Sequence, residues 1–294
     1  MRALYDVPAP GKLNLFLHIT GRRADGYHLL QSVFMLIDWC DTLNFELRAD
    51  GALTREDLTT ALPPDDLVLR AARALQAATG TAQGAHIGVA KHLPAQAGMG
   101  GGSSDAASCL LALNRLWKLG LNGPDLERIG LALGADVPFF VFGRNAWVEG
   151  IGERLQPIAL PKARFWVLKP TTGLDTASIF SAPDLQRQTK TAIIEDFAAV
   201  DSSGSPSPAD MYCWGRNDMQ PVAERHCPEV AHAAAWLQQR FGNSRMTGSG
   251  SAVFARAGAG DQPTATFPAD ELPPGWVGRL CRSLGQHPLA DWAG

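Results

Sequence analysis

The glycine-rich stretch 94–108, with the sequence PAQAGMGGGSSDAAS, is the part of the chain whose residue types point most directly to chemistry. Four glycines occupy the five positions from 98 to 102, and an apolar helix is expected directly after them. Glycine permits positive φ and lets bare backbone N–H groups approach an anion, and the first turn of a helix presents N–H groups without intrahelical partners. The stretch therefore predicts a loop that holds the phosphates of a nucleotide.

This loop differs from the common phosphate-binding sequences. The chain has no G-x-x-x-x-G-K-[ST] segment, and the pattern G-x-G-x-x-G fails because Ser103 occupies its last position. The structural alternative is a flexible turn, since Ser103, Ser104 and Asp105 include residue types that cap helices. The loop alone therefore indicates a nucleotide but specifies no reaction.

Asp136 and Lys12 are the candidates for acid–base chemistry. Asp136 is the only acidic residue between Glu127 and Glu149, and apolar residues follow it directly. A carboxylate in such surroundings is suited to act as a general base, although an ordinary loop aspartate has the same signature. Lys12 precedes an apolar strand and is a candidate cation, although a lysine beside a strand is usually a solvated residue. Of the seven histidines, only His28, beside Tyr27 on a polar turn, keeps a possible functional role.

Composition limits the class of protein. A chain of 294 residues with a formal charge of −3 and scattered basic residues predicts two domains and no nucleic-acid or membrane partner. The N-terminus has no apolar signal region and no apolar run is long enough to span a bilayer. The spacing of the five cysteines fits neither a metal site nor a disulfide framework, so we expect a cytoplasmic protein and assign no metal-binding residues. The cysteines are Cys40, Cys109, Cys213, Cys227 and Cys281.

Periodicity and turn residues predict an α+β fold that positions these candidates. In the first half we expect strands at 13–19, 29–37, 41–48 and 86–93, a polar connection at 51–64, helices at 67–75, 104–119 and 124–133, and a strand pair at 147–152 and 155–160. After a domain boundary at 161–162 we expect strands at 164–169 and 276–284, helices at 175–180, 190–200, 215–225 and 228–241, a surface loop at 201–209, and a glycine turn entering a strand within 244–255.

Three separated motifs resemble those of the GHMP kinases, in the order usual for that family: 8–15 (PAPGKLNL), the loop 94–107, and 246–250 (MTGSG). Two further segments, 17–30 with GRRADGYH and 133–140 with LGADVPFF, are similar to the members that act on 4-diphosphocytidyl-2-C-methyl-D-erythritol. The similarity extends over residues 5–255.

The resemblance implies a fold and a reaction. Residues 1–160 would form an N-terminal domain like the second domain of ribosomal protein S5, residues 161–294 a ferredoxin-like C-terminal domain, and the active site would lie between them. The implied reaction transfers the γ-phosphoryl group of ATP to the 2-hydroxyl of the methylerythritol, in the non-mevalonate route to isoprenoids. We expect Mg²⁺ to enter with ATP, a small-molecule acceptor, and a monomer or homodimer.

The resemblance also implies roles for individual residues. Asp136 would accept the hydroxyl proton, Lys12 would hold the hydroxyl and offset negative charge, and Asn14 would help to place the acceptor. Tyr27, His28 and Phe180 would bind the cytosine by stacking and hydrogen bonding. The residues implied to hold the ATP phosphates are Pro94, Ala95, Gln96, Ala97, Gly98, Met99, Gly100, Gly101, Gly102, Ser103 and Ser104.

Three positions depart from the family pattern, and two alternative functions remain. Gly11 stands where the family commonly has Ala, and Met99 where it has Leu. Asp66 stands where the family often has an Asn that is suited to contact adenine, so adenine contacts are left unassigned.

One alternative is another GHMP kinase, acting on mevalonate, homoserine or a sugar, but those acceptors have no base for Tyr27 and His28 to bind. The other is a non-catalytic nucleotide-binding protein. The presence of a lysine and an aspartate at the two catalytic positions argues against it.

Overall fold

Two β-sheets divide the chain at the short connection 158–162, in a computed structural model that describes residues 2–197, 208–259 and 271–293. The first sheet has the order β3-β4-β2-β5-β6, with β1 paired to β2, and only β3 and β4 run parallel. Its strands are β1 (Ala3–Arg22), β2 (His28–Arg48), β3 (Leu53–Asp57), β4 (Gly84–Ala90), β5 (Ala146–Glu149) and β6 (Arg154–Pro157). The second sheet has the antiparallel order β10 (Val277–Arg282), β7 (Ala163–Lys169), β9 (Val253–Ala259) and β8 (Arg245–Met246).

Strand β2 is continuous where the sequence predicts two strands. The predicted gap at 38–40 is part of the strand, where Cys40 pairs with Pro10 of β1 and Asp38 pairs with Arg282. The next residue, Asp41, is fully buried. Its carboxylate accepts the backbone N–H groups of His92 and Leu93 at 2.5 and 2.7 Å and pairs with the ammonium of Lys91. The sequence also missed β3, which lies in the predicted polar connection 51–64.

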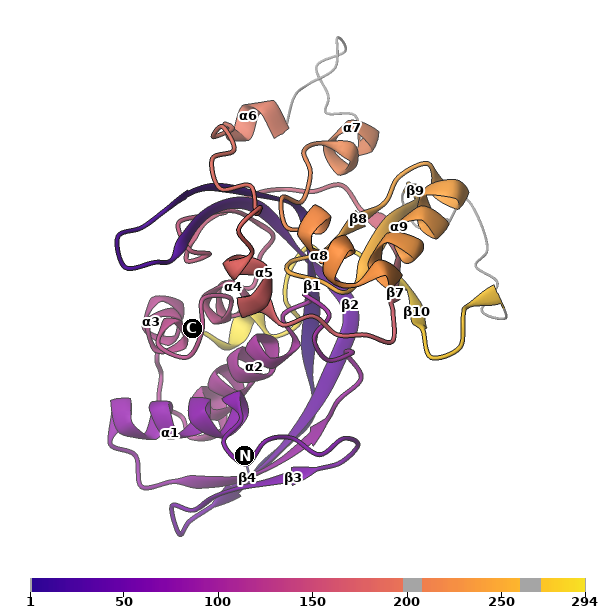
Figure 1. Ribbon diagram of the computed structural model, residues 1–294. Coiled ribbons are helices and arrows are strands. Elements are labelled where there is room, and N and C mark those ends of the chain that lie inside the picture. The colour runs from indigo at the N-terminus through magenta and orange to yellow at the C-terminus, as the bar shows by residue number, and fades with distance from the viewer. Residues whose placement is uncertain (1, 198–207, 260–270, 294) are drawn as a thin grey trace.

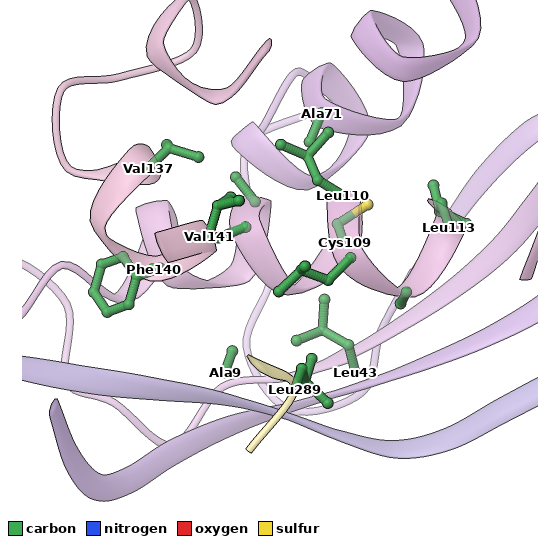
Figure 2. Close-up of a cluster of buried hydrophobic side chains, with 14 of the residues drawn as sticks. Ala9, Leu43, Ala71, Cys109, Leu110, Leu113, Val137, Phe140, Val141 and Leu289 are labelled. Atoms are coloured by element: carbon green, nitrogen blue, oxygen red, sulfur yellow. The ribbon is translucent and has the colours of Figure 1, made fainter. Parts of the chain in front are cut away.

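Helices α1 (Leu67–Thr79), α2 (Gly101–Leu116), α3 (Gly123–Leu131) and α4 (Val137–Phe142) gather on one side of the first sheet (Figure 1). Apolar side chains from all four helices form one buried cluster with those of the strands. Leu110, Val141 and Leu43 are among its members (Figure 2). The side chain of Asp66 caps the start of α1 by accepting the N–H of Leu69 at 3.1 Å. This packing fixes α2, and with it the end of the glycine-rich loop.

In the second half, α8 (Gln220–His226) and α9 (Pro228–Phe241) pack against the second sheet (Figure 1). Ile179 of α5 (Thr176–Ser181) belongs to the same apolar cluster, which also includes Leu17 and Ile19 of β1. The predicted helix 190–200 is observed only as α6 (Ile194–Phe197), and its last three positions lie outside the described residues. Most of the predicted loop 201–209 also lies outside them, and α7 (Pro208–Cys213) follows. A short 3₁₀ helix, Ala290–Trp292, closes the chain against α2. In the described part of the chain, no helix combines the length and hydropathy that crossing a bilayer requires.

An apolar cluster joins the two sheets. Leu13 and Met35 of the first sheet and Phe165 and Phe254 of the second are all buried in it. The α+β prediction is confirmed, with the two sheets separating where a boundary was expected. The assignment of 1–160 and 161–294 as two domains stays a prediction, because the shared cluster means that each half buries part of the other.

Candidate active site

A cleft of about 790 Å³ runs from the glycine-rich loop to helix α5. Lys12, Asn14, Asp136 and Phe180 line it, as do all the predicted loop residues from 94 to 103. Ser104 does not line it, because its hydroxyl is fully buried and donates to the carbonyl of Pro10 at 2.7 Å. The cleft therefore brings together predicted residues from segments more than 160 positions apart.

The start of α2 is open toward this cleft. The helix begins at Gly101 after Gly100, whose φ of 71° is in the left-handed region, and within the described residues no side chain caps it. The serines and Asp105, which the sequence suggested as caps, lie inside the helix instead, and Asp105 pairs with Lys91. The first N–H groups of α2 thus remain available for an anion, as the nucleotide interpretation requires.

Two glycines of the loop are required because neighbouring atoms leave no space for a side chain. A Cβ at Gly98 would lie 2.1 Å from the carbonyl oxygen of Thr247, and a Cβ at Gly100 would lie 2.9 Å from the ring of Phe140. Both residues also have positive φ. The absence of side chains lets the loop lie directly against the third sequence motif and against α4.

Lys12 and Asp136 form an ion pair in the cleft, with 3.5 Å between Nζ and Oδ2. The register of β1 against β2 shifts between Pro10 and Lys12, which turns the lysine side chain inward, and its backbone N–H donates to the carbonyl of Met99. The Lys12 side chain is only 4% exposed, and burial lowers its pKa while Asp136 opposes the shift. Asp136 is 31% exposed, so its setting is more open than its apolar neighbours in sequence suggested.

A buried hydrogen-bond network holds the lysine. Its ammonium donates to Asn14 Oδ1 at 2.5 Å, and Asn14 Nδ2 donates to the hydroxyl of Ser32 at 3.0 Å. The hydroxyl of Thr247 accepts the backbone N–H of Asn14 at 2.9 Å and lies 3.4 Å from the carbonyl of Gly98. Ser32 and Thr247 were given no role from the sequence, although Thr247 belongs to the third motif.

The predicted base-binding residues are only partly assembled. The rings of His28 and Phe180 are stacked with centroids 4.9 Å apart and planes at 21°. Phe180 lines the cleft, but His28 and Tyr27 are not among the described residues that do. Tyr27 is 60% exposed on the turn between β1 and β2, so its role stays a prediction.

Two of the three positions that depart from the family pattern, Asp66 and Gly11, have distinctive structural surroundings. Asp66 caps α1 and pairs with Arg55 at 2.7 Å, which occupies its carboxylate. A Cβ at Gly11 would lie 2.9 Å from Leu93 Cδ2, so an alanine there requires that leucine to move. Lys91, which the sequence gave no reason to select, lines the cleft between Asp41 and Asp105.

Comparisons with known proteins identify the family of the chain. Residues 66–144 match the GHMP kinases N terminal domain and residues 208–265 match the GHMP kinases C terminal family. A 4-diphosphocytidyl-2-C-methyl-D-erythritol kinase of Variovorax paradoxus (strain S110) is 64% identical over 298 residues, which cover 100% of both chains. One from Paracidovorax citrulli (strain AAC00-1) is 62% identical over 100% of this chain and 99% of the relative.

Solved structures extend the comparison to the fold. The crystal structure of a 4-(cytidine 5'-diphospho)-2C-methyl-D-erythritol kinase aligns with a TM-score of 0.72 and 33% identity, over 86% of this chain and 90% of the other. A homoserine kinase from Cytophaga hutchinsonii has a TM-score of 0.65 over 98% and 96% of the two chains but only 14% identity, so it shares the fold alone. The chain therefore belongs to the 4-diphosphocytidyl-2-C-methyl-D-erythritol kinase family of the GHMP kinases.

Proposed function

We propose that the chain transfers the γ-phosphoryl group of ATP to the 2-hydroxyl of 4-diphosphocytidyl-2-C-methyl-D-erythritol. The observation that carries the catalytic part is the Lys12–Asp136 pair, which lies in one cleft with the open start of α2. The choice of acceptor rests on relatives of that name that are up to 64% identical over the full chain.

In this proposal the acceptor oxygen attacks the γ-phosphorus as its proton passes to the carboxylate of Asp136. The bond between the γ-phosphorus and its bridging oxygen breaks, and ADP leaves with that oxygen. The ammonium of Lys12, 3.5 Å from the carboxylate, offsets negative charge on the attacking oxygen. The same ammonium is held by Asn14, so its position does not depend on Asp136 alone.

Positioning supplies much of the remaining catalysis. Phosphoryl transfer depends mainly on alignment and charge neutralisation, which backbone N–H groups and one lysine can provide without a basic surface. The N–H groups at the start of α2, at Gly101, Gly102 and Ser103, would bind phosphate oxygens. A chain with a net charge of −3 can therefore bind two polyanionic substrates.

The proposal includes Mg²⁺ that enters with ATP. Among the described residues, no group of three or more His, Cys, Asp or Glu side chains is placed to hold a metal ion. The carboxylates of Asp66 and Asp105 in the cleft are paired with Arg55 and Lys91. The phosphates would thus supply most of the metal's ligands, and the metal would neutralise their charge.

An acceptor panel tests the proposal. Purified protein with ATP and Mg²⁺ is assayed for ADP release with 4-diphosphocytidyl-2-C-methyl-D-erythritol, mevalonate, homoserine and galactose. We expect turnover with the first compound alone. Turnover with another acceptor and none with the first would overturn the substrate assignment, and ATP binding without any turnover would favour a non-catalytic protein.

A further inference from the structure

Arg187, in the segment that follows α5, donates hydrogen bonds to five groups at once. Its Nη2 contacts the carbonyls of Phe180 and Ala182 at 3.0 and 2.6 Å. Its Nη1 contacts the carbonyls of Leu185 and Pro183 at 3.1 and 3.4 Å, and its Nε lies 3.1 Å from Nε2 of His28. One side chain therefore connects the end of α5 to the beginning of β2, 159 positions away.

The contact with His28 fixes the chemistry of the imidazole. A guanidinium has donors and no acceptor, so the nitrogen that faces it must be unprotonated. A neutral imidazole has one N–H, and with Nε2 as acceptor that proton lies on Nδ1. His28 is consequently held as a neutral ring with a single donor of known position.

The same arginine also fixes the ring stacked on His28. Phe180 lies in the last turn of α5, where backbone carbonyls lack intrahelical partners. Arg187 satisfies the carbonyls of Phe180 and Ala182, which anchors the backbone that carries the phenyl ring. The stacked pair, with centroids 4.9 Å apart, thus has one support common to both of its members.

We propose that Arg187 is a positioning residue for cytosine recognition, which holds His28 as an Nδ1–H donor and Phe180 as a stacking surface. This inference rests on the proposed function, in which both rings bind the acceptor base. Cytosine presents acceptors at O2 and N3, whereas uracil carries a hydrogen on N3. A fixed donor that faces N3 therefore favours cytosine, and a ring free to change tautomer loses part of that preference.

The charges around His28 agree with a neutral ring. Burial lowers the pKa of His28, and the cations Arg187 and Arg22 lower it further. Arg22 is at the end of β1, and the nearby turn carries the exposed pair of Arg23 and Asp25. Removal of Arg187 should raise this pKa, because one of the two nearest positive charges disappears.

The direct test is the tautomer of His28, measured by long-range ¹H–¹⁵N NMR on protein with ¹⁵N-labelled histidine. The His28 signals are assigned by their loss in His28→Gln. We expect the Nδ1–H form in the wild type, and in Arg187→Met a mixed or Nε2–H form with a raised pKa. An Nε2–H ring in the wild type, or a spectrum unchanged in Arg187→Met, would overturn the proposal.

Steady-state kinetics test the consequence for binding. In Arg187→Met we expect the acceptor KM to rise about tenfold and the ATP KM to stay constant, with a smaller preference for the cytidine acceptor over its uridine analogue. Arg187→Lys should restore part of the preference, because an ammonium is also only a donor. Arg225→Met is the matched control, since Arg225 anchors the same segment through Asp184 without contacting His28.

The outcomes separate this inference from the proposed function. If wild-type protein fails to use the cytidine acceptor, the proposed function fails, and with it the role in cytosine recognition, while the NMR result still decides whether Arg187 fixes the tautomer of His28. If His28→Gln raises the acceptor KM and Arg187→Met changes it no more than Arg225→Met does, the proposed function stands. The positioning role is then wrong.

Discussion

The loop end of the cleft and its base-binding end are held in different ways. At the loop end, Lys12, Asn14 and Thr247 are buried, and each is held by residues distant in sequence. At the other end, where Phe180 lines the cleft and the cytosine is proposed to bind, Tyr27 is 60% exposed, and Arg187 contacts both His28 and the carbonyl of Phe180. The proposed catalytic side chains are thus preorganised, whereas the side chains proposed to bind the base have few contacts that fix their positions. Substitutions should accordingly lower kcat or raise the ATP KM at the first end and raise the acceptor KM at the second.

The largest effect is expected for Asp136→Asn. An amide cannot take the hydroxyl proton, so kcat should fall by about 10²- to 10⁴-fold. The ATP KM should change little, because the phosphates are assigned to the loop and α2. The measurement is initial-rate ADP release with isothermal titration of an ATP analogue. A variant with near-normal kcat would show that Asp136 is only a structural partner of Lys12.

The next largest effect is expected for Gly100→Ala. The new methyl group would lie 2.9 Å from the Phe140 ring at a φ of 71°, so the loop must shift and the ATP KM should rise at least tenfold. The matched control is Gly80→Ala, which has a φ of 66° and open space around it. It should cost about 1 kcal/mol of stability by denaturant titration and leave the ATP KM unchanged. Equal ATP KM values in both variants would contradict a tight loop.

Tyr27→Ala should affect the acceptor and leave ATP binding unchanged, the reverse of Gly100→Ala. Stacking on a base contributes about 1 to 3 kcal/mol, so the acceptor KM should rise by roughly 5- to 150-fold while the ATP KM stays constant. Because the tyrosine is exposed, the melting temperature should not change. An unchanged acceptor KM would remove Tyr27 from the site.

The smallest effect concerns Asp105, beside the loop. Burial raises its pKa to about 7 against the opposing charge of Lys91, and Asp41 adds to the rise. The folded protein therefore binds a proton that the unfolded chain releases near pH 4, so this group lowers stability as the pH rises from about 4 to 7. The melting temperature of Asp105→Asn minus that of the wild type should therefore increase by a few degrees between pH 5 and pH 8. A difference independent of pH would contradict this account.

Sequence reasoning identified the loop end better than the base-binding end. Glycine spacing, a lysine before a strand and a lone acid in apolar surroundings each have a physical meaning without a structure. The support given by Arg187 has no such signal, because its partners are a β2 side chain 159 positions away and backbone carbonyls. The break predicted at 38–40 failed for a related reason, since those residues stay in the strand through partners distant in sequence, Pro10 for Cys40 and Arg282 for Asp38.

The most direct test of the account is a ³¹P NMR record of the wild-type reaction with ATP, Mg²⁺ and 4-diphosphocytidyl-2-C-methyl-D-erythritol. If Lys12 and Asp136 direct the acceptor hydroxyl to the γ-phosphorus, one new phosphomonoester signal on the 2-hydroxyl will appear for each ADP formed, with the diphosphate signals of the acceptor retained. Formation of ADP with inorganic phosphate, and with the acceptor unchanged, would contradict the account.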